Sequence, residues 1–419
     1  MQLANASART ALAGALCAVA LWTAGCGGGV TGNDGRPTLA ETIIGADPDA
    51  TFFEEDDNNL FEGAQLILVA AQDTLIRGHI SGSRDVDVYD LGPMLAGDRV
   101  IVEMVPDAGL NGAIAVFDDN QACKLVNDHR NVYLGVKEPF IDVVFERASA
   151  SCYIAVASTP TQSSSGDYAL IASKFAASEP SEPRGDVVLL NFDGGSGVRI
   201  GSRSAIDVPI FDAASISSRY AGQTDDIIAQ AVARIRADFV PYDITVLSTS
   251  EGASADALTT VLFFGTFDEA LLGVAEGVDE FNATQGQHAI VFTDTFAAFD
   301  PLQPSAEEMS QALANVASHE IGHLLGLVHT ADPQGIMDVT ASLSQLLDDQ
   351  DFTMSVLHDD VFPLGSQDAV QSLVDTLGGD AELSRALAQT SELEIRSLKR
   401  AVTTRARSVA HFSTCSLEH

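Results

Sequence analysis

The segment spanning residues 319–329, HEIGHLLGLVH, constrains the fold more than any other part of the chain. It holds three of the nine histidines of a 419-residue protein. Residues four apart on a helix lie on the same face, because each residue advances about 100° around the axis. His319 and His323 therefore predict a helix that presents two imidazoles to one metal ion.

The other residues of this segment suit a catalytic metal site. Glu320 follows the first histidine, so its carboxylate can reach a metal-bound water without filling a ligand position, as a general base requires. Gly326 permits a left-handed backbone that ends the helix, and His329 then completes a set of three histidines with an open fourth position. The alternative is a group of incidental surface histidines, but chance rarely places Gly326 and His329 in register with the first pair.

The segment matches HExxHxxGxxH and resembles the signature of the metzincin clan of zinc metallopeptidases. The resemblance implies that His319, His323 and His329 bind one catalytic Zn²⁺ and that Glu320 is the catalytic residue. Met337, within PQGIMDV, follows the third histidine by eight residues and resembles the methionine turn of this clan. This short separation favours the matrixin-like group, although no tyrosine follows Met337 as it does in some relatives.

The implied activity is that of an endopeptidase. Zinc would activate a water molecule, and Glu320 would take its proton and pass it to the leaving amine. In the clan an edge strand pairs with extended substrate, and here that strand should lie between Phe264 and Phe292. Two alternatives stay open: a non-catalytic binding or adhesion lipoprotein with a metzincin-like domain, which the intact Glu320 disfavours, and a zinc hydrolase acting on non-peptide amides.

Strand and helix patterns alternate around this segment, so residues 186–390 are predicted to form an α/β (α+β) domain with a mixed sheet and an active-site helix. Apolar runs predict strands within residues 186–192, 242–248, 258–265 and 288–296. One helix should cover residues 224–239, with Thr224 as its N-cap. The active-site helix should begin after Ser305 and end at Gly326, and a further helix should start near Ser366.

The preceding region, residues 56–176, is predicted to be an antiparallel, jelly-roll-like β-sandwich, because short apolar runs recur between turn residues. Residues 80–105 resemble the bacterial pre-peptidase C-terminal domain, a module that usually follows the catalytic domain of secreted peptidases but would precede it here. Residues 177–185, rich in Pro, Ser and charge, are a predicted linker.

Residues 1–25 predict a secretory signal, because Arg9 precedes an apolar run that is too short for a comfortable membrane span. The sequence TAGC, which ends at Cys26, resembles a bacterial lipobox but has Thr23 where leucine is usual. The resemblance implies a lipid anchor on Cys26, with ordinary cleavage as the alternative, and residues 26–55 would form a flexible tether. We therefore expect an exported lipoprotein of the bacterial cell envelope, or otherwise a secreted protein.

The formal net charge of -37 argues against nucleic acid as a partner, because it repels phosphate. The expected partners are a protein or peptide substrate and, through the anchor, the membrane. Acidic runs such as residues 52–59 could bind Ca²⁺, but none has EF-hand spacing. In an oxidising compartment Cys123 and Cys152 predict a disulfide worth about 3–4 kcal/mol. Residues 391–419, which carry a basic cluster, should form a C-terminal helix and tail, either solvated or in contact with membrane or the acidic body of the protein.

Overall fold

The computed structural model describes residues 51–55, 58–67, 74–129, 138–160, 163–176, 178–180, 182–379 and 413–415. Contacts divide the chain into Met1–Ile44 and Gly45–His419, and all described residues belong to the second unit. The predicted signal segment, the candidate anchor Cys26 and residues 391–412 and 416–419 of the predicted tail lie outside the described residues. In the part that is described, no helix is long and apolar enough to cross a membrane.

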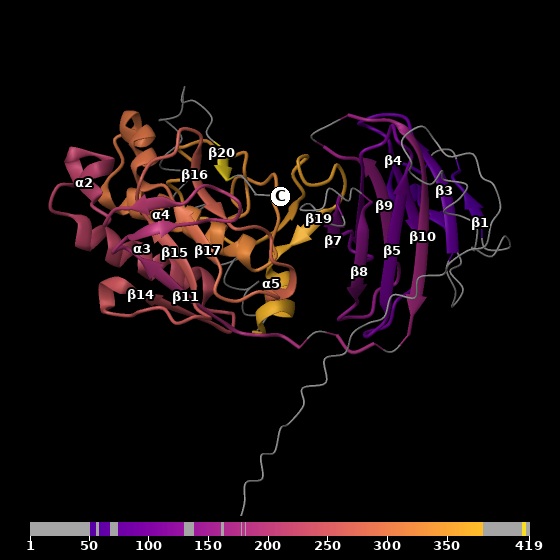
Figure 1. The fold of residues 1–419 in the computed structure, drawn as a ribbon, viewed down its shortest axis with the longest axis horizontal. Helices are drawn as coiled ribbons and strands as arrows, with labels where there is room; N and C mark the ends of the chain where they lie inside the picture. The colour runs from indigo at the N-terminus through magenta and orange to yellow at the C-terminus, as the bar shows by residue number, and fades with distance from the viewer. Residues whose placement is uncertain are drawn as a thin grey trace, which may run out of the picture. The chain divides into compact units, whose positions relative to one another are not determined.

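The first ten strands form two five-stranded sheets, drawn in indigo to magenta in Figure 1. The order of the first sheet is β1 (Thr51–Phe53), β3 (Thr74–Ile80), β10 (Gly166–Phe175), β5 (Arg99–Pro106) and β8 (Phe140–Val144). The order of the second is β2 (Gln65–Leu66), β4 (Val86–Asp90), β9 (Tyr153–Ser158), β6 (Gly112–Phe117) and β7 (Cys123–Asn127). Neighbouring strands are antiparallel except in the pairs β1–β3 and β2–β4. The predicted β-rich N-terminal part is thus confirmed, and β1 lies in the segment that was assigned to the tether.

Burial follows the apolar pattern of these strands. In β5, Val100, Val102 and Met104 are buried, while the residues between them are only partly covered. Side chains of both sheets share one hydrophobic cluster, in which Val102 comes from the first sheet and Ile154 from the second. Full burial of such a side chain stabilises the fold by about 1.5–3 kcal/mol.

The predicted disulfide between Cys123 and Cys152 is wrong, because both cysteines are free thiols. Cys123 pairs with Phe117 across β6–β7, and Phe117 pairs on its other side with Tyr153, the residue after Cys152. A strand therefore separates the two cysteines, and strands lie about 4.7–4.9 Å apart. Two such spacings exceed the Cα separation of about 4.4–6.8 Å that a disulfide needs. The thiols also belong to different hydrophobic clusters.

The C-terminal part is built on a six-stranded mixed sheet, as predicted. Its order is β14 (Ile244–Ser248), β11 (Asp186–Asn191), β15 (Thr260–Phe264), β17 (His288–Val291), β16 (Leu271–Ala275) and β20 (Ser413–Cys415). Only β16 and β17 pair in the antiparallel sense. The two small sheets are β12 (Gly195–Val198) with β13 (Ile206–Val208), and β18 (Met354–Val356) with β19 (Ser366–Asp368). The 3₁₀ helices are η2 (Phe61–Gly63), η3 (Ser218–Tyr220), η4 (Thr249–Glu251), η5 (Glu280–Asn282) and η6 (Thr293–Leu302).

The helices of this part are α2 (Ala213–Ile216), α3 (Thr224–Phe239), α4 (Ala306–Leu324) and α5 (Ala369–Leu377). The predicted cap of α4 is confirmed: Ser305 and Glu308 form a reciprocal capping box. The predicted cap of α3 is wrong, because Gln223 is its N-cap, while the Thr224 hydroxyl accepts from the backbone N–H of Ala213. From Met309 to its end α4 is buried, and its side chains share one hydrophobic core with α3 and the mixed sheet.

The N-terminal sheets contact the segment that follows the histidine motif. The rings of Phe117 and Phe362 lie 5.9 Å apart between centroids. The backbone N–H of Ser366 donates to the carbonyl of Gln121 at 3.0 Å, and Ala122 and Ser366 form a parallel β-bridge. The second sheet is therefore packed against residues close to the candidate site.

Candidate metal centre and active site

The structure brings His319, His323 and His329 together. The first two lie on α4 and the third on the chain that leaves it, and they are exposed by 2%, 0% and 4%. The Nε2 atoms of His319 and His323 are 3.1 Å apart, and one ligand nitrogen from each of the three lies within 4.8 Å of the others. A tetrahedral zinc ion with Zn–N bonds of about 2.0–2.1 Å would hold its nitrogens about 3.3–3.4 Å apart. The three side chains could therefore hold one such ion.

Each Nδ1 atom of this triad has a partner that fixes its ring. Nδ1 of His319 is 2.7 Å from the carbonyl oxygen of Ile336, and Nδ1 of His323 is 2.8 Å from that of Leu327. Nδ1 of His329 is 3.1 Å from Oδ2 of Asp360. A histidine that donates from Nδ1 leaves the lone pair of Nε2 free for a metal.

Burial favours the neutral form of His319 and His323. It lowers the pKa of His319 to about 3, with a further contribution from the charge of His329. The pKa of His323 also lies well below its usual value, because of burial and the two neighbouring histidines. Nε2 of His329 is buried and has no hydrogen-bond partner among the described residues. A buried polar atom without a partner lowers the stability of the fold, and a metal ion bound to this nitrogen would supply the missing partner.

Glu320 lies where α4 meets β16. Its side chain is fully buried. A Cβ atom added at Gly273 of β16 would lie 2.3 Å from its Oε1, so the glycine leaves the space that the carboxylate fills. Glu320 therefore projects from the histidine helix toward the strand predicted to bind substrate.

Two glycines shape the ends of this site. Gly326 has φ of 92°, as the predicted left-handed turn requires, and its N–H donates to the carbonyl of His323 at 2.9 Å. A Cβ atom at Gly322 would lie 2.5 Å from the sulfur of Met337. Met337 is 2% exposed and packs against the helix between the two ligand histidines, next to Ile336, the partner of His319.

Sequence reasoning missed Asp360. Asp360 follows His329 by 31 residues and lies outside the motif. Its role is seen only in the folded structure, where its carboxylate contacts Nδ1 of that histidine. Its other oxygen is 2.7 Å from Nδ1 of His358. Burial alone would raise the pKa of Asp360, but hydrogen bonds and charge from His329 and His358 outweigh it and lower this pKa to about 2.

The predicted edge strand is β16, which lies between Phe264 and Phe292 and is antiparallel to β17. Its outer edge is paired with β20, in which Cys415 lies opposite Gly273. Among the described residues β20, and not β16, is therefore the edge strand of the sheet, and the prediction of an edge strand between Phe264 and Phe292 is wrong in this respect.

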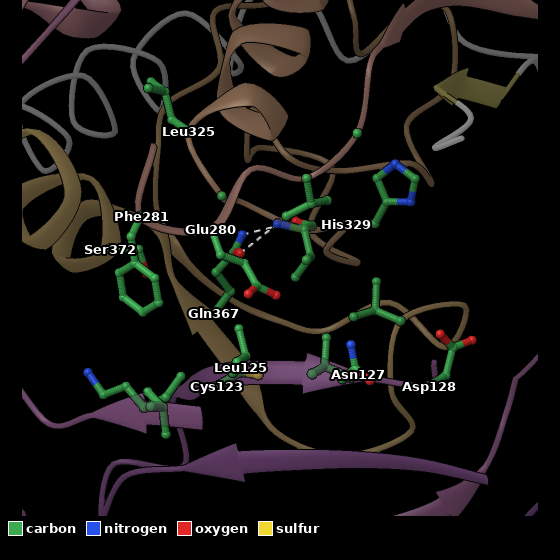
Figure 2. Close-up of a pocket in the computed structure, with 18 of the residues that line it drawn as sticks. Cys123, Leu125, Asn127, Asp128, Glu280, Phe281, Leu325, His329, Gln367 and Ser372 are labelled. Carbon is green, nitrogen blue, oxygen red and sulfur yellow. Dashed lines mark hydrogen bonds between the residues drawn. The ribbon is translucent and has the colours of Figure 1, made fainter. Parts of the chain in front are cut away.

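A cavity of about 700 Å³ adjoins the triad, and His329 and Asp360 contribute to its lining. Figure 2 shows Cys123, Leu125 and Asn127 from β7 on one side of it, facing the segments that carry Glu280 and His329.

A comparison with known protein families identifies the part of the chain that holds the triad. Residues 223–361 match the family model described as Matrixin. None of the curated proteins matches the chain. Similar solved structures include archaemetzincin from Methanopyrus kandleri, at 13% identity over 40% of this chain and 87% of that one, with a TM-score of 0.23. A zinc-dependent peptidase from Methanocorpusculum labreanum is 19% identical over 39% of this chain and 93% of that one, with a TM-score of 0.20.

A third similar structure is of a different kind of module. It is the pre-peptidase C-terminal domain of a collagenase from Bacillus anthracis, at 16% identity over 26% of this chain and 93% of that one, with a TM-score of 0.21. The matrixin match and the histidine geometry, rather than these low-scoring likenesses, connect residues 223–361 with zinc peptidases. The metzincin resemblance predicted from the motif is confirmed for this part of the chain.

Proposed function

We propose that the matrixin-like part of the chain is a zinc-dependent endopeptidase that acts on protein or peptide substrates. The observation that carries the proposal is the triad: three buried histidines with fixed Nδ1 atoms and ligand nitrogens within 4.8 Å of one another. His319, His323 and His329 would hold one zinc ion and leave its fourth position to water or substrate.

Bound zinc would polarise the peptide carbonyl and lower the pKa of a bound water toward about 7. Glu320 would take the proton of the attacking water and later deliver it to the leaving amine. Its full burial keeps this carboxylate out of bulk water, and Gly273 leaves room for it against β16. Extended substrate would pair with the backbone of β16 in place of β20, so the scissile bond would pass beside Glu320.

We also infer that the two N-terminal sheets form a jelly-roll-like β-sandwich. In the orders β3-β10-β5-β8 and β4-β9-β6-β7, the first strand of each set lies beside the last strand of that set. From β3 to β10 the chain crosses between the two sheets at every step except from β6 to β7, which pair within the second sheet, and such crossing is compatible with a double-sheet jelly roll. Shared burial of Val102 and Ile154 supports face-to-face packing.

Export and anchoring rest on the sequence. We propose cleavage before Cys26, lipidation of that residue, and attachment to the bacterial cell envelope. Mass spectrometry of protein made in a bacterial host with lipoprotein processing should find lipid on an N-terminal Cys26. An unmodified N-terminus at another residue would refute the anchor, and a protein retained with its leader in the cytoplasm would refute export.

The activity is tested by incubating the purified protein with a mixture of internally quenched peptides, with and without a chelator. We expect cleavage at internal bonds, loss of cleavage with chelator and recovery when zinc is added back. His323→Ala should bind no zinc and cleave nothing, because two remaining imidazoles rarely retain the ion. A wild-type protein that binds zinc but cleaves no peptide would favour the binding or adhesion alternative.

A further inference from the structure

The cavity beside the triad has walls from both halves of the described unit. One wall is β7 of the second N-terminal sheet, and the other is the turn from Gly277 to Phe281 together with the chain around His329. The contacts of Phe117 with Phe362 and of Gln121 with Ser366 hold these walls together. A side chain of a peptide bound at the triad that entered this cavity beside His329 would contact β7 as well as the catalytic part.

The lining of this cavity is acidic. Five carboxylates contribute to it, and they are Asp128, Glu146, Glu280, Asp360 and Asp375. Three of them have cationic or histidine partners, which are His129 for Asp128, His329 and His358 for Asp360, and Arg147 for Asp375. The one lysine of the lining, Lys124, lies 3.9 Å from Asp118.

Glu146 and Glu280 are the two lining carboxylates left, and a backbone hydrogen bond and the charge of Lys124 favour the charged form of Glu146, whereas Glu280 has no such support. Among the described residues it has neither a hydrogen-bond partner nor an ion-pair partner, and Figure 2 shows it between β7 and the chain near His329. Burial, with a smaller contribution from the charge of Asp279, raises its pKa to about 7. A cation placed beside it would offset this cost, because opposite charges within about 4–6 Å favour the charged form of a carboxyl group.

The turn that carries Glu280 is held in an unusual conformation. Phe281 and Asn282 have φ of 60° and 48°, which side-chain-bearing residues seldom adopt. The backbone N–H of Asp279 donates to the carbonyl of His323 at 3.0 Å, and its carboxylate accepts from the N–H of Thr284 at 2.8 Å. The position of Glu280 is thus tied to the end of the histidine helix.

We propose that this cavity receives a lysine or arginine side chain of the peptide substrate, with Glu280 as the residue that selects it. The proposal rests on the proposed peptidase function and adds a substrate class to it. Leu125, Phe281 and Leu325 in the lining would contact the methylene stem, while the cationic end would reach Glu280. The carboxylates disfavour an acidic side chain at the same place.

The test uses internally quenched peptides in which one lysine moves through every position, and matched sets that carry glutamine or glutamate instead. At one position we expect kcat/KM to be about tenfold higher for lysine than for glutamine, which corresponds to about 1.4 kcal/mol. Glu280→Gln should bring this ratio close to one. Glu182→Gln is the control, because it removes an exposed carboxylate that is not in the lining. It tests whether the net charge of -37 attracts basic peptides in general, and it should leave the ratio of lysine to glutamine cleavage as in wild type.

A lysine preference that Glu280→Gln leaves unchanged, or no preference at any position, would overturn the proposal. Failure of the peptidase function is distinguished by a second readout that needs no cleavage. Fluorescence anisotropy on zinc-loaded Glu320→Ala protein measures the affinity for the same lysine and glutamine peptides. Equal affinities for the lysine and glutamine peptides would refute the basic subsite. Tighter binding of the lysine peptide that is lost when Glu280→Gln is added would support it, even if wild-type protein cleaves no peptide.

Discussion

Replacing Asp360 by asparagine tests the part of the metal site that lies outside the motif. The carboxylate accepts from Nδ1 of His329 at 3.1 Å and so favours the tautomer whose Nε2 is free. Partners of this kind typically contribute about 10- to 100-fold in metal affinity. The side chain is 43% exposed, and solvent screens such an interaction, so we expect a loss near the lower figure, about tenfold.

The assay is competition for zinc between the protein and a chromophoric chelator at neutral pH. Asp359→Asn is the matched control, because this exposed neighbour has no part in the triad, and it should bind zinc as wild type does. His358→Ala removes only the second partner of Asp360, at 2.7 Å, and should have a smaller effect than Asp360→Asn. Unchanged affinity in Asp360→Asn, or equal losses in Asp359→Asn, would refute the role of the carboxylate in orienting His329.

Three further predictions concern the fold and the edge strand. Phe117→Ala should lower the free energy of unfolding in urea by about 3–5 kcal/mol, because the Phe117 ring is fully buried against Phe362. Phe267→Ala is the control, because this side chain is 59% exposed, and it should change that free energy by less than about 0.5 kcal/mol. Burial raises the pKa of Asp87 to about 8, so the folded chain holds a proton that the unfolded chain releases near pH 4. Stability should therefore fall as pH rises through this window, and by less in Asp87→Asn, which urea titrations at several pH values would detect. Deleting residues 413–419 removes β20 from β16 and should raise kcat/KM for peptide cleavage, and an unchanged value would show that β20 does not compete with substrate.

The features that sequence predicted well depend on local spacing. Ser305 caps α4 by accepting from the backbone of a residue three positions on, and the pairing of His319 with His323 follows from one helical turn. Gly326 takes its positive φ for the same local reason, the need to end the helix before the third histidine.

The features that sequence missed depend on contacts between distant residues. β7 has only half-buried residues and no period-two pattern, because it faces the catalytic part as well as its own sheet. Thr224 begins α3 as predicted, but Asp212 and Ala213 engage its hydroxyl, so it does not cap the helix. The prediction of a disulfide rests on an oxidising compartment and on the place of both cysteines in one strand-rich region. Neither criterion shows that β6 lies between the strand of Cys123 and the strand that follows Cys152.

The most direct test of the central claim is to measure zinc content and peptide cleavage together in Glu320→Gln. Glu320 is beside the triad but is not one of its three ligands, so the variant should hold as much zinc as wild type. Cleavage should fall by about 10²- to 10⁴-fold, because a general base typically contributes that much. Cleavage at the wild-type rate with zinc bound would contradict the proposed role of this carboxylate.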